Sequence, residues 1–155
     1  MCHTGAMREV EKYWVGRAME LARRAADAGD VPVGALVVDA SGSILGEGWN
    51  TREVDNDPAG HAEIVALRAA ARALGSWRLE GCDLYVTLEP CTMCAGAIVA
   101  ARVRRVIFGA WDAKAGAAGS IRDVLRDSRL NHQVEVIGGV REEECARQLR
   151  EFFGR

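Results

Sequence analysis

The sequence predicts a three-layer α/β/α sandwich built around a mixed five-stranded sheet. Two strand-like runs joined by a Ser-Gly turn indicate an opening hairpin, and the segments after it alternate between strand and helix patterns. A hairpin followed by βα units gives a mixed sheet with helices on both faces. The chain has no internal repeat, linker or low-complexity tract, so we expect residues 1–155 to form a single domain.

The first half of the chain is expected to supply a long helix, the hairpin and a second helix. Apolar residues recur in the first helix at near-helical spacing, at Val10, Trp14, Leu21 and Ala25. Gly29 follows as a stop signal, and an alanine- and leucine-rich stretch predicts the second helix, which begins near residue 61. The expected elements are a helix over residues 9–28, strands over 33–38 and 44–49, a polar loop over 51–60 and a helix over 64–74.

The second half of the chain is expected to alternate strands with helices. A short apolar strand leads to Pro90 and the helix that follows it, and a glycine-rich loop comes after the next strand. The expected elements are strands over residues 84–88, 103–108 and 134–137, helices over 91–101 and 142–153, a flexible loop over 116–120 and a short helix over 121–125.

Two short motifs indicate the chemistry: H-A-E at residues 61–63 and P-C-T-M-C at residues 90–94. His61, Cys91 and Cys94 offer three ligands for zinc, and a catalytic zinc keeps three protein ligands while a structural zinc usually has four. Glu63 follows the histidine closely enough to exchange protons with the water in the fourth position. The pattern H-x-E followed by P-C-x-x-C is the signature of zinc nucleobase deaminases. The sequence therefore predicts a hydrolytic deaminase with one zinc ion per chain.

Each residue of this set has a chemical reason for its position. Cys91 and Cys94 are three residues apart at a helix start, so both thiols lie on one face, where the helix dipole and the metal favour thiolates. Glu63 can take a proton from water, pass it to a ring nitrogen and then protonate the departing amine. The carbon attacked would be C6 of a purine or C4 of a pyrimidine.

The cysteines also allow other interpretations. A lone Cys-x-x-C is more often half of a structural zinc site or a redox pair, but the chain has no second Cys-x-x-C to complete a four-thiolate site. Cys82 and Cys145 are isolated and are expected to be small core residues. Five cysteines, of which two would bind metal, suit a reducing cytoplasm better than a disulfide framework.

Composition excludes several classes of protein. The 155 residues are 49% hydrophobic and 27% charged, which is typical of a soluble globular domain. A net charge of −2 argues against a non-specific nucleic-acid coat, although it leaves room for a local basic patch. No apolar run reaches membrane-spanning length, and residues 1–6 show no export signal, so we expect a cytoplasmic protein that does not enter membranes.

From about residue 14 to residue 153 the chain resembles the bacterial tRNA-specific adenosine deaminases, within the cytidine deaminase-like superfamily. Beside the two metal motifs, the resemblance rests on V-P-V-G-A at 31–35, G-E-G-W-N at 46–50, F-G-A-W-D-A-K-A-G-A-A-G-S at 108–120 and E-C-A at 144–146. The metal motif alone indicates the superfamily. The loop at 108–120 and Asn50 indicate the tRNA branch.

The resemblance implies roles for five further residues. Asn50 would hydrogen-bond the purine, although an Asn that caps a strand-to-loop turn is the alternative. Val33 would form an apolar wall of the base pocket, where a buried strand valine is the ordinary interpretation. Asp112 and Lys114 would contact the flipped nucleotide or its neighbours. Phe153 would meet an anticodon-loop base, or else pack the last helix onto the core.

One loop residue departs from the family pattern. Trp111 stands where a smaller or basic residue is more familiar, and stacking on a nucleotide or packing in a dimer would explain it.

The resemblance also implies an activity and partners. The expected reaction converts adenosine to inosine at the wobble position of a tRNA anticodon, in bacteria chiefly the arginine tRNA, by a homodimer that binds zinc. The alternative within enzymes is a deaminase of a free base or nucleotide, such as guanine, cytosine or deoxycytidylate. An inactive zinc-stabilised RNA-binding module is the alternative from another class, and Glu63 argues against it because a structural site needs no carboxylate beside water.

Overall fold

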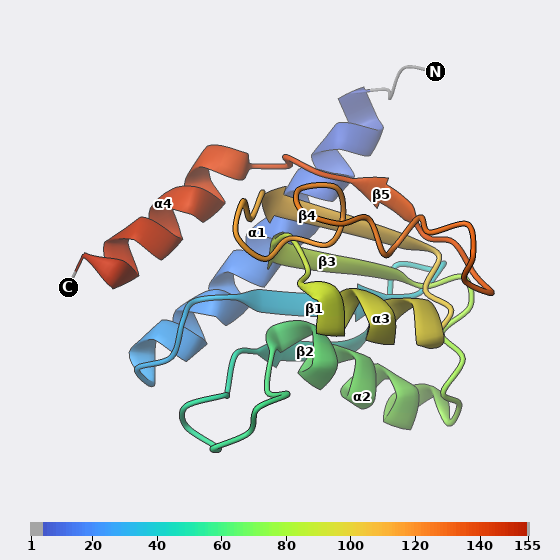
Figure 1. Ribbon diagram of the computed structural model, residues 1–155, viewed down its shortest axis with the longest axis horizontal. Helices are drawn as coiled ribbons and strands as arrows, with labels where there is room; N and C mark the ends of the chain where they lie inside the picture. Colours follow the sequence, from blue (N-terminus) through green and yellow to red (C-terminus); the bar gives the residue numbers. More distant parts are fainter. Residues whose placement is uncertain (1–4, 155) are drawn as a thin grey trace.

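A five-stranded sheet in the order β2-β1-β3-β4-β5 forms the centre of the computed structural model, which describes residues 5–154 (Figure 1). Its strands are β1 (Gly34–Val38), β2 (Ile44–Trp49), β3 (Asp83–Leu88), β4 (Arg105–Ala110) and β5 (Glu135–Ile137). β1 is antiparallel to β2 and β3, whereas β4 is parallel to β3 and β5. The predicted mixed sheet and opening hairpin are therefore confirmed. Cys2 and most of the N-terminal segment considered for an export signal lie outside the described residues.

Helices cover both faces of the sheet. They are α1 (Gly5–Asp27), α2 (Ala62–Leu74), α3 (Thr92–Ala100) and α4 (Glu142–Phe153). Figure 1 shows α1 crossing behind the sheet and α2 and α3 in front of it, and α4 shares the layer of α1, since Cys145 belongs to the same apolar cluster as Val15 and Leu21 of α1. The three-layer prediction is confirmed. In the part of the chain that the structure describes, no helix combines the length and apolar character needed to span a membrane.

Neighbouring residues of the central strands face opposite layers, as the two-residue period of a strand requires. In β1, Val37 belongs to the apolar cluster that α2 and α3 share, whereas Leu36 belongs to the cluster on the α1 side. Both side chains are fully buried. Cys82 and Cys145 are buried too, one in each cluster, which confirms their prediction as core residues.

The backbone of α2 lies directly on β2. A Cβ atom added to Gly46 would lie 2.5 Å from the carbonyl oxygen of Ala66, and one added to Gly48 would lie 2.5 Å from that of Ala62. Real Cβ atoms do not come so close to backbone atoms, so these two glycines set the distance between helix and strand.

Some boundaries differ from those predicted. Residues 121–125 do not form the expected short helix, because the segment pairs with the loop before it. Ala118 and Asp123 form an isolated β-bridge, and Val124 donates its backbone N–H to the carbonyl of Ala117 at 2.8 Å. The fourth strand begins at Arg105 rather than at residue 103, because the Val103 N–H bonds to the carbonyl of Ile98 in the turn after α3. The first helix begins earlier than expected, at residue 5, and Val10 is exposed on it while Leu21 and Ala25 are buried.

Candidate active site

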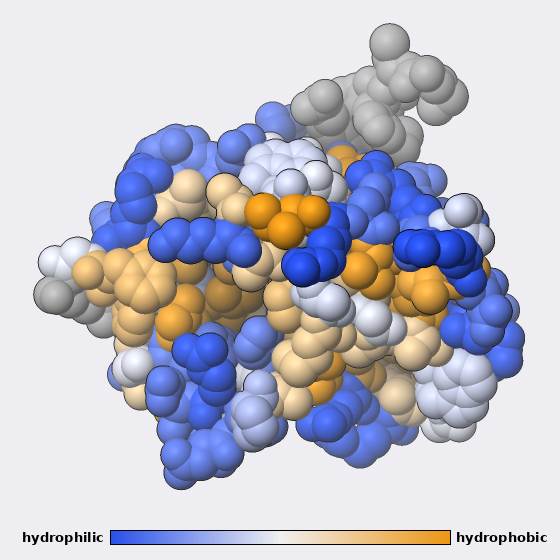
Figure 2. All heavy atoms as spheres, in the orientation of Figure 1, coloured by the Kyte–Doolittle hydropathy of each residue, from blue (hydrophilic) through white to orange (hydrophobic). Residues whose placement is uncertain are grey.

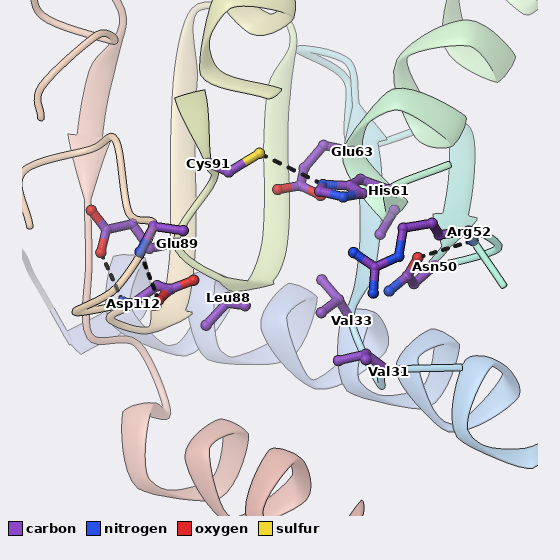
Figure 3. Close-up of a pocket in the computed structure, with 12 residues that line it drawn as sticks. Val31, Val33, Asn50, Arg52, His61, Glu63, Leu88, Glu89, Cys91 and Asp112 are labelled. Atoms are coloured by element: carbon purple, nitrogen blue, oxygen red, sulfur yellow. Dashed lines mark hydrogen bonds between the residues drawn. The ribbon is translucent and has the colours of Figure 1, made fainter. Parts of the chain in front are cut away.

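Two helix N-termini bring the metal motifs together. His61 is the N-cap of α2 and Cys91 is the N-cap of α3, and both have extended backbone conformations, with φ/ψ of −84°/151° and −77°/176°. Pro90 helps to end β3 because it has no N–H for strand pairing, and the chain then turns directly into α3. The side chains of His61 and Cys91 consequently point into one space at the edge of the sheet (Figure 3).

His61, Cys91 and Cys94 form a compact cluster of possible metal ligands. The Nδ1 atom of His61 lies 3.6 Å from Sγ of Cys91 and 3.5 Å from Sγ of Cys94. Zn–N bonds of about 2.1 Å and Zn–S bonds of about 2.3 Å in a tetrahedron place N and S about 3.6 Å apart. The donor set and its spacing therefore fit zinc, with three protein ligands as in a catalytic site.

The sulfur of Cys91 is the more acidic of the pair. Hydrogen bonds from Cys94 and His61 to this sulfur lower the pKa of Cys91 to about 3. The same interaction with Cys91, together with burial, raises the pKa of Cys94. The surroundings of Cys91 therefore favour its thiolate, the form in which a cysteine binds a metal ion.

Glu63 lies in the first turn of α2, beside the cluster. Its side chain is buried, and Figure 3 shows the carboxylate next to His61 and facing Cys91. Burial raises the pKa of Glu63 to about 7, with smaller opposing contributions from a backbone hydrogen bond and from His61. A carboxyl group that titrates near neutral pH can both accept and donate a proton, as a general acid–base catalyst must.

A pocket opens over the cluster. Its lining comes from the strand ends, the two helix starts and the two flanking loops, and consists of Val31, Val33, Asn50, Arg52, His61, Ala62, Glu63, Leu88, Glu89, Cys91, Asp112 and Ala115. Of the substrate-binding residues expected from the sequence, the pocket contains Val33, Asn50 and Asp112 and does not contain Lys114 or Phe153.

Asn50 caps a turn and also lines the pocket. Its Oδ1 accepts a hydrogen bond from the backbone N–H of Arg52 at 3.2 Å, so the side chain caps the turn that follows β2. Its Nδ2 has no hydrogen-bond partner among the described residues, and the residue lines the pocket. The turn-cap interpretation is confirmed, and the amide nitrogen is still available as a donor.

Val33 forms an apolar wall of the pocket with Val31 and Leu88 (Figure 3). It is also a nearly buried core residue, 8% exposed, which agrees with the ordinary interpretation, and its contact with a base stays a prediction.

Asp112 and Lys114 belong to one turn beside the pocket. Oδ1 of Asp112 accepts the backbone N–H groups of Lys114 at 3.0 Å and Ala115 at 3.1 Å. The Lys114 side chain is exposed and lies outside the pocket lining. Trp111, just before this turn, packs edge-to-face on Phe108 with ring centroids 4.7 Å apart and is 43% exposed.

Phe153 is 67% exposed at the end of α4, so its expected alternative, packing the last helix onto the core, is wrong. Its ring meets the neighbouring Phe152 edge-to-face, with centroids 5.4 Å apart. Figure 1 shows α4 ending on the same side of the molecule as the loop after β2 and the starts of α2 and α3.

Two charged residues of the pocket were missed from the sequence. Arg52 points its guanidinium toward the pocket mouth, and no ion pair engages it within residues 5–154 (Figure 3). Its position two residues after Asn50 was the available signal. Glu89 is buried directly after β3, and a carboxylate immediately before Pro-Cys was the only local signal.

Comparison with known proteins assigns the site to a family. Residues 8–110 match the cytidine and deoxycytidylate deaminase zinc-binding region. The chain is 49% identical to the tRNA-specific adenosine deaminase of Haemophilus influenzae over 145 residues, which cover 94% of this chain and 84% of the relative. The chain belongs to the tRNA-specific adenosine deaminase family. The expected resemblance is thus confirmed, and so is the zinc-dependent class of the site.

Solved structures agree with this membership. A structure from studies of A-to-I editing by tRNA:A34 deaminases at the wobble position of transfer RNA superposes with a TM-score of 0.84 and 42% identity, covering 88% of this chain and 99% of that one. Guanine deaminase from Nitrosomonas europaea superposes with a TM-score of 0.81 at 25% identity, covering 93% and 85% of the two chains. The tRNA-specific adenosine deaminase family therefore shares its fold with enzymes that act on a free base.

Proposed function

We propose that this protein converts adenosine to inosine at the wobble position of a tRNA anticodon, chiefly in the arginine tRNA of a bacterium. One zinc ion per chain would be held by His61, Cys91 and Cys94. The observation that carries the proposal is the buried Glu63 carboxylate beside a three-ligand cluster in an open pocket. The relative named above supports RNA rather than a free base as the substrate.

The residues of the chain divide the chemistry between them. When bound, zinc supplies Lewis-acid activation of water. Glu63 takes a proton from the attacking water as the new C–O bond forms at C6, and delivers that proton to N1 of the ring. It then passes the second proton to the exocyclic nitrogen as the C6–N6 bond breaks, so that adenosine and water become inosine and ammonia.

The rim of the pocket would bind the flipped nucleotide. The free Nδ2 of Asn50 would donate a hydrogen bond to an acceptor on the purine edge, and Val33 would pack against the base. Asp112, Lys114 and Phe153 would contact the target nucleotide and its neighbours in the anticodon loop, whose bases are already unpaired.

The main competing function is deamination of a free base or nucleotide, because a guanine deaminase shares the fold. The experiment incubates the zinc-loaded protein with an arginine tRNA transcript and, separately, with guanine, cytosine, adenosine and deoxycytidylate. Inosine in the transcript alone supports the proposal. Turnover of guanine or cytosine without inosine in the transcript would overturn it.

We also propose that the chain is a single domain that works as a homodimer in the cytoplasm. An apolar groove between α2 and α3 supports the dimer, and its lining includes Leu67, Trp77, Ala97 and Ala100. Figure 2 shows apolar side chains gathered over this part of the surface. Ala100→Glu would place a charge in the groove, so sedimentation should report a dimer for the parent and a monomer for the variant.

A further inference from the structure

A buried carboxylate joins one flanking loop of the pocket to the metal motif. Glu89 directly follows β3, two residues before Cys91, and is 2% exposed. Its Oε2 accepts the backbone N–H groups of Ala118 and Ser120, each at 3.0 Å. Its Oε1 accepts the backbone N–H of Asp112 at 2.9 Å and the hydroxyl of Ser120. Both oxygens of one side chain are thus used entirely by the segment 112–120, which we call the 112–120 loop.

The backbone around this carboxylate strengthens the connection. The N–H of Ala117 donates to the carbonyl of Pro90 at 2.8 Å, and Cys91 forms an isolated β-bridge with Gly116. Any Cβ on Gly116 would collide with the Glu89 carboxylate. The 112–120 loop therefore lies with its backbone directly against Glu89 and the first metal-motif residues.

The same loop presents the residues proposed to meet RNA. Asp112, whose N–H is held by Glu89, lines the pocket and in turn binds the N–H groups of Lys114 and Ala115 through Oδ1. A continuous series of hydrogen bonds therefore runs from Glu89 through Asp112 to the turn that carries Lys114.

We propose that Glu89 is a positioning residue that holds the 112–120 loop against the metal motif, so that the loop presents Asp112 and Lys114 to the anticodon loop at a fixed distance from the reacting base. The proposal rests on the function proposed above. Only an ionised carboxylate fits this role, because four donors converge on it and it has two oxygens with about four acceptor sites.

Glu89→Gln is the direct test, since it keeps the size of the side chain but turns an N–H donor toward the N–H groups of the loop. The variant should weaken the contacts that the 112–120 loop makes with RNA. Because these contacts would stabilise substrate and transition state equally, KM for an anticodon stem-loop should rise roughly 10- to 100-fold. The kcat should stay within about threefold of the parent value. The zinc content should equal that of the parent. Ser120→Ala, which removes only the hydroxyl, should give a smaller rise in KM and keeps the test available if Glu89→Gln does not fold.

Asp39→Asn provides the matched control. Oδ1 of Asp39 likewise accepts two backbone N–H groups, from Ser41 and Ser43, and a serine hydroxyl, but in the turn between β1 and β2 at the opposite end of the strand from the pocket. This variant should leave KM unchanged. Hydrogen exchange gives a readout independent of activity: in Glu89→Gln the amides of residues 112, 118 and 120 should exchange at least about tenfold faster, with α2 and α3 unaffected.

The outcomes separate this inference from the proposed function. A parent that makes no inosine in the stem-loop removes the proposed function, and with it the RNA-presenting role of Glu89. An active parent with an unchanged KM in Glu89→Gln, or with unchanged exchange in the 112–120 loop, overturns the positioning role alone. A fall in kcat together with loss of zinc would make Glu89 a structural support of the metal motif instead, and would also overturn the inference.

Discussion

The floor and the rim of the pocket are built in different ways. The floor consists of His61, Glu63, Cys91 and Cys94, all at the starts of two helices that pack on the sheet, and all buried or half-buried. We call the surroundings of the pocket, formed by the two flanking loops and the end of α4, its rim. Arg52 lines the pocket, Lys114 and Phe153 lie outside its lining, and all three side chains are exposed. The groups of the floor are thus held by regular elements, whereas the proposed substrate contacts lie on segments whose sequence can change at low cost to the core. The chemistry and the choice of substrate should therefore respond separately to mutation.

The largest effect should come from the ligands in the floor. Cys91→Ala and Cys94→Ala each remove a thiolate, so zinc content should fall from about one per chain to near zero and turnover should become undetectable. Elemental analysis of the purified variants checks this. Full zinc occupancy in either variant would contradict the proposed ligand set.

Glu63→Ala should show that metal binding and proton transfer are separate roles of the floor residues. Because Glu63 is not one of the three ligands, the variant should keep its zinc and its fold, as measured by elemental analysis and circular dichroism. Its single-turnover rate should nevertheless fall by roughly 10²–10⁴-fold, the usual contribution of a general acid–base catalyst. A near-normal rate would remove Glu63 from the mechanism.

At the rim, Phe153→Ala should weaken RNA handling and spare the chemistry. Stacking of a base on an aromatic ring contributes about 1–3 kcal/mol, so kcat/KM on an anticodon stem-loop should fall by roughly one to two decades, with zinc unchanged. Tyr13→Ala is the control, since Tyr13 is 57% exposed on α1 and is given no role with RNA. Equal losses in both variants would show that an exposed aromatic ring has no special function at the end of α4.

The smallest effect should come from Lys114→Ala. Loss of one phosphate contact should lower the slope of log affinity against log salt by about 0.7 for a single strand, with a modest loss of affinity at low salt. Lys12, the only other lysine in the sequence, lies on α1 and gives the matched variant Lys12→Ala. Identical salt series for both variants would place Lys114 outside the RNA contact.

The sequence was most informative where the signals are local. The ligand set could be predicted because His61 and the Cys-x-x-C pair each begin a helix, and the order of strands and helices then brings the two starts together. The short helix expected over residues 121–125 was wrong because pairing with residues 117 and 118 overrides the local preference. Glu89 could not be recognised in advance, since its partners lie 23 to 31 residues further along the chain. The roles given to Asn50, Asp112, Lys114 and Phe153 stay predictions.

The close contact between α2 and β2 has a consequence for how this enzyme could evolve. The first turn of α2 carries His61 and Glu63, and Gly46 and Gly48 leave no room for even a methyl group beneath that helix. Under selection for editing, a random library should therefore accept many residues at exposed rim positions such as 52 and 114. Among the active members of the same library, substitutions at positions 46 and 48 should be nearly absent, although neither glycine lines the pocket. Two glycines on a neighbouring strand thus limit which mutations the enzyme tolerates more than most residues that would touch the RNA.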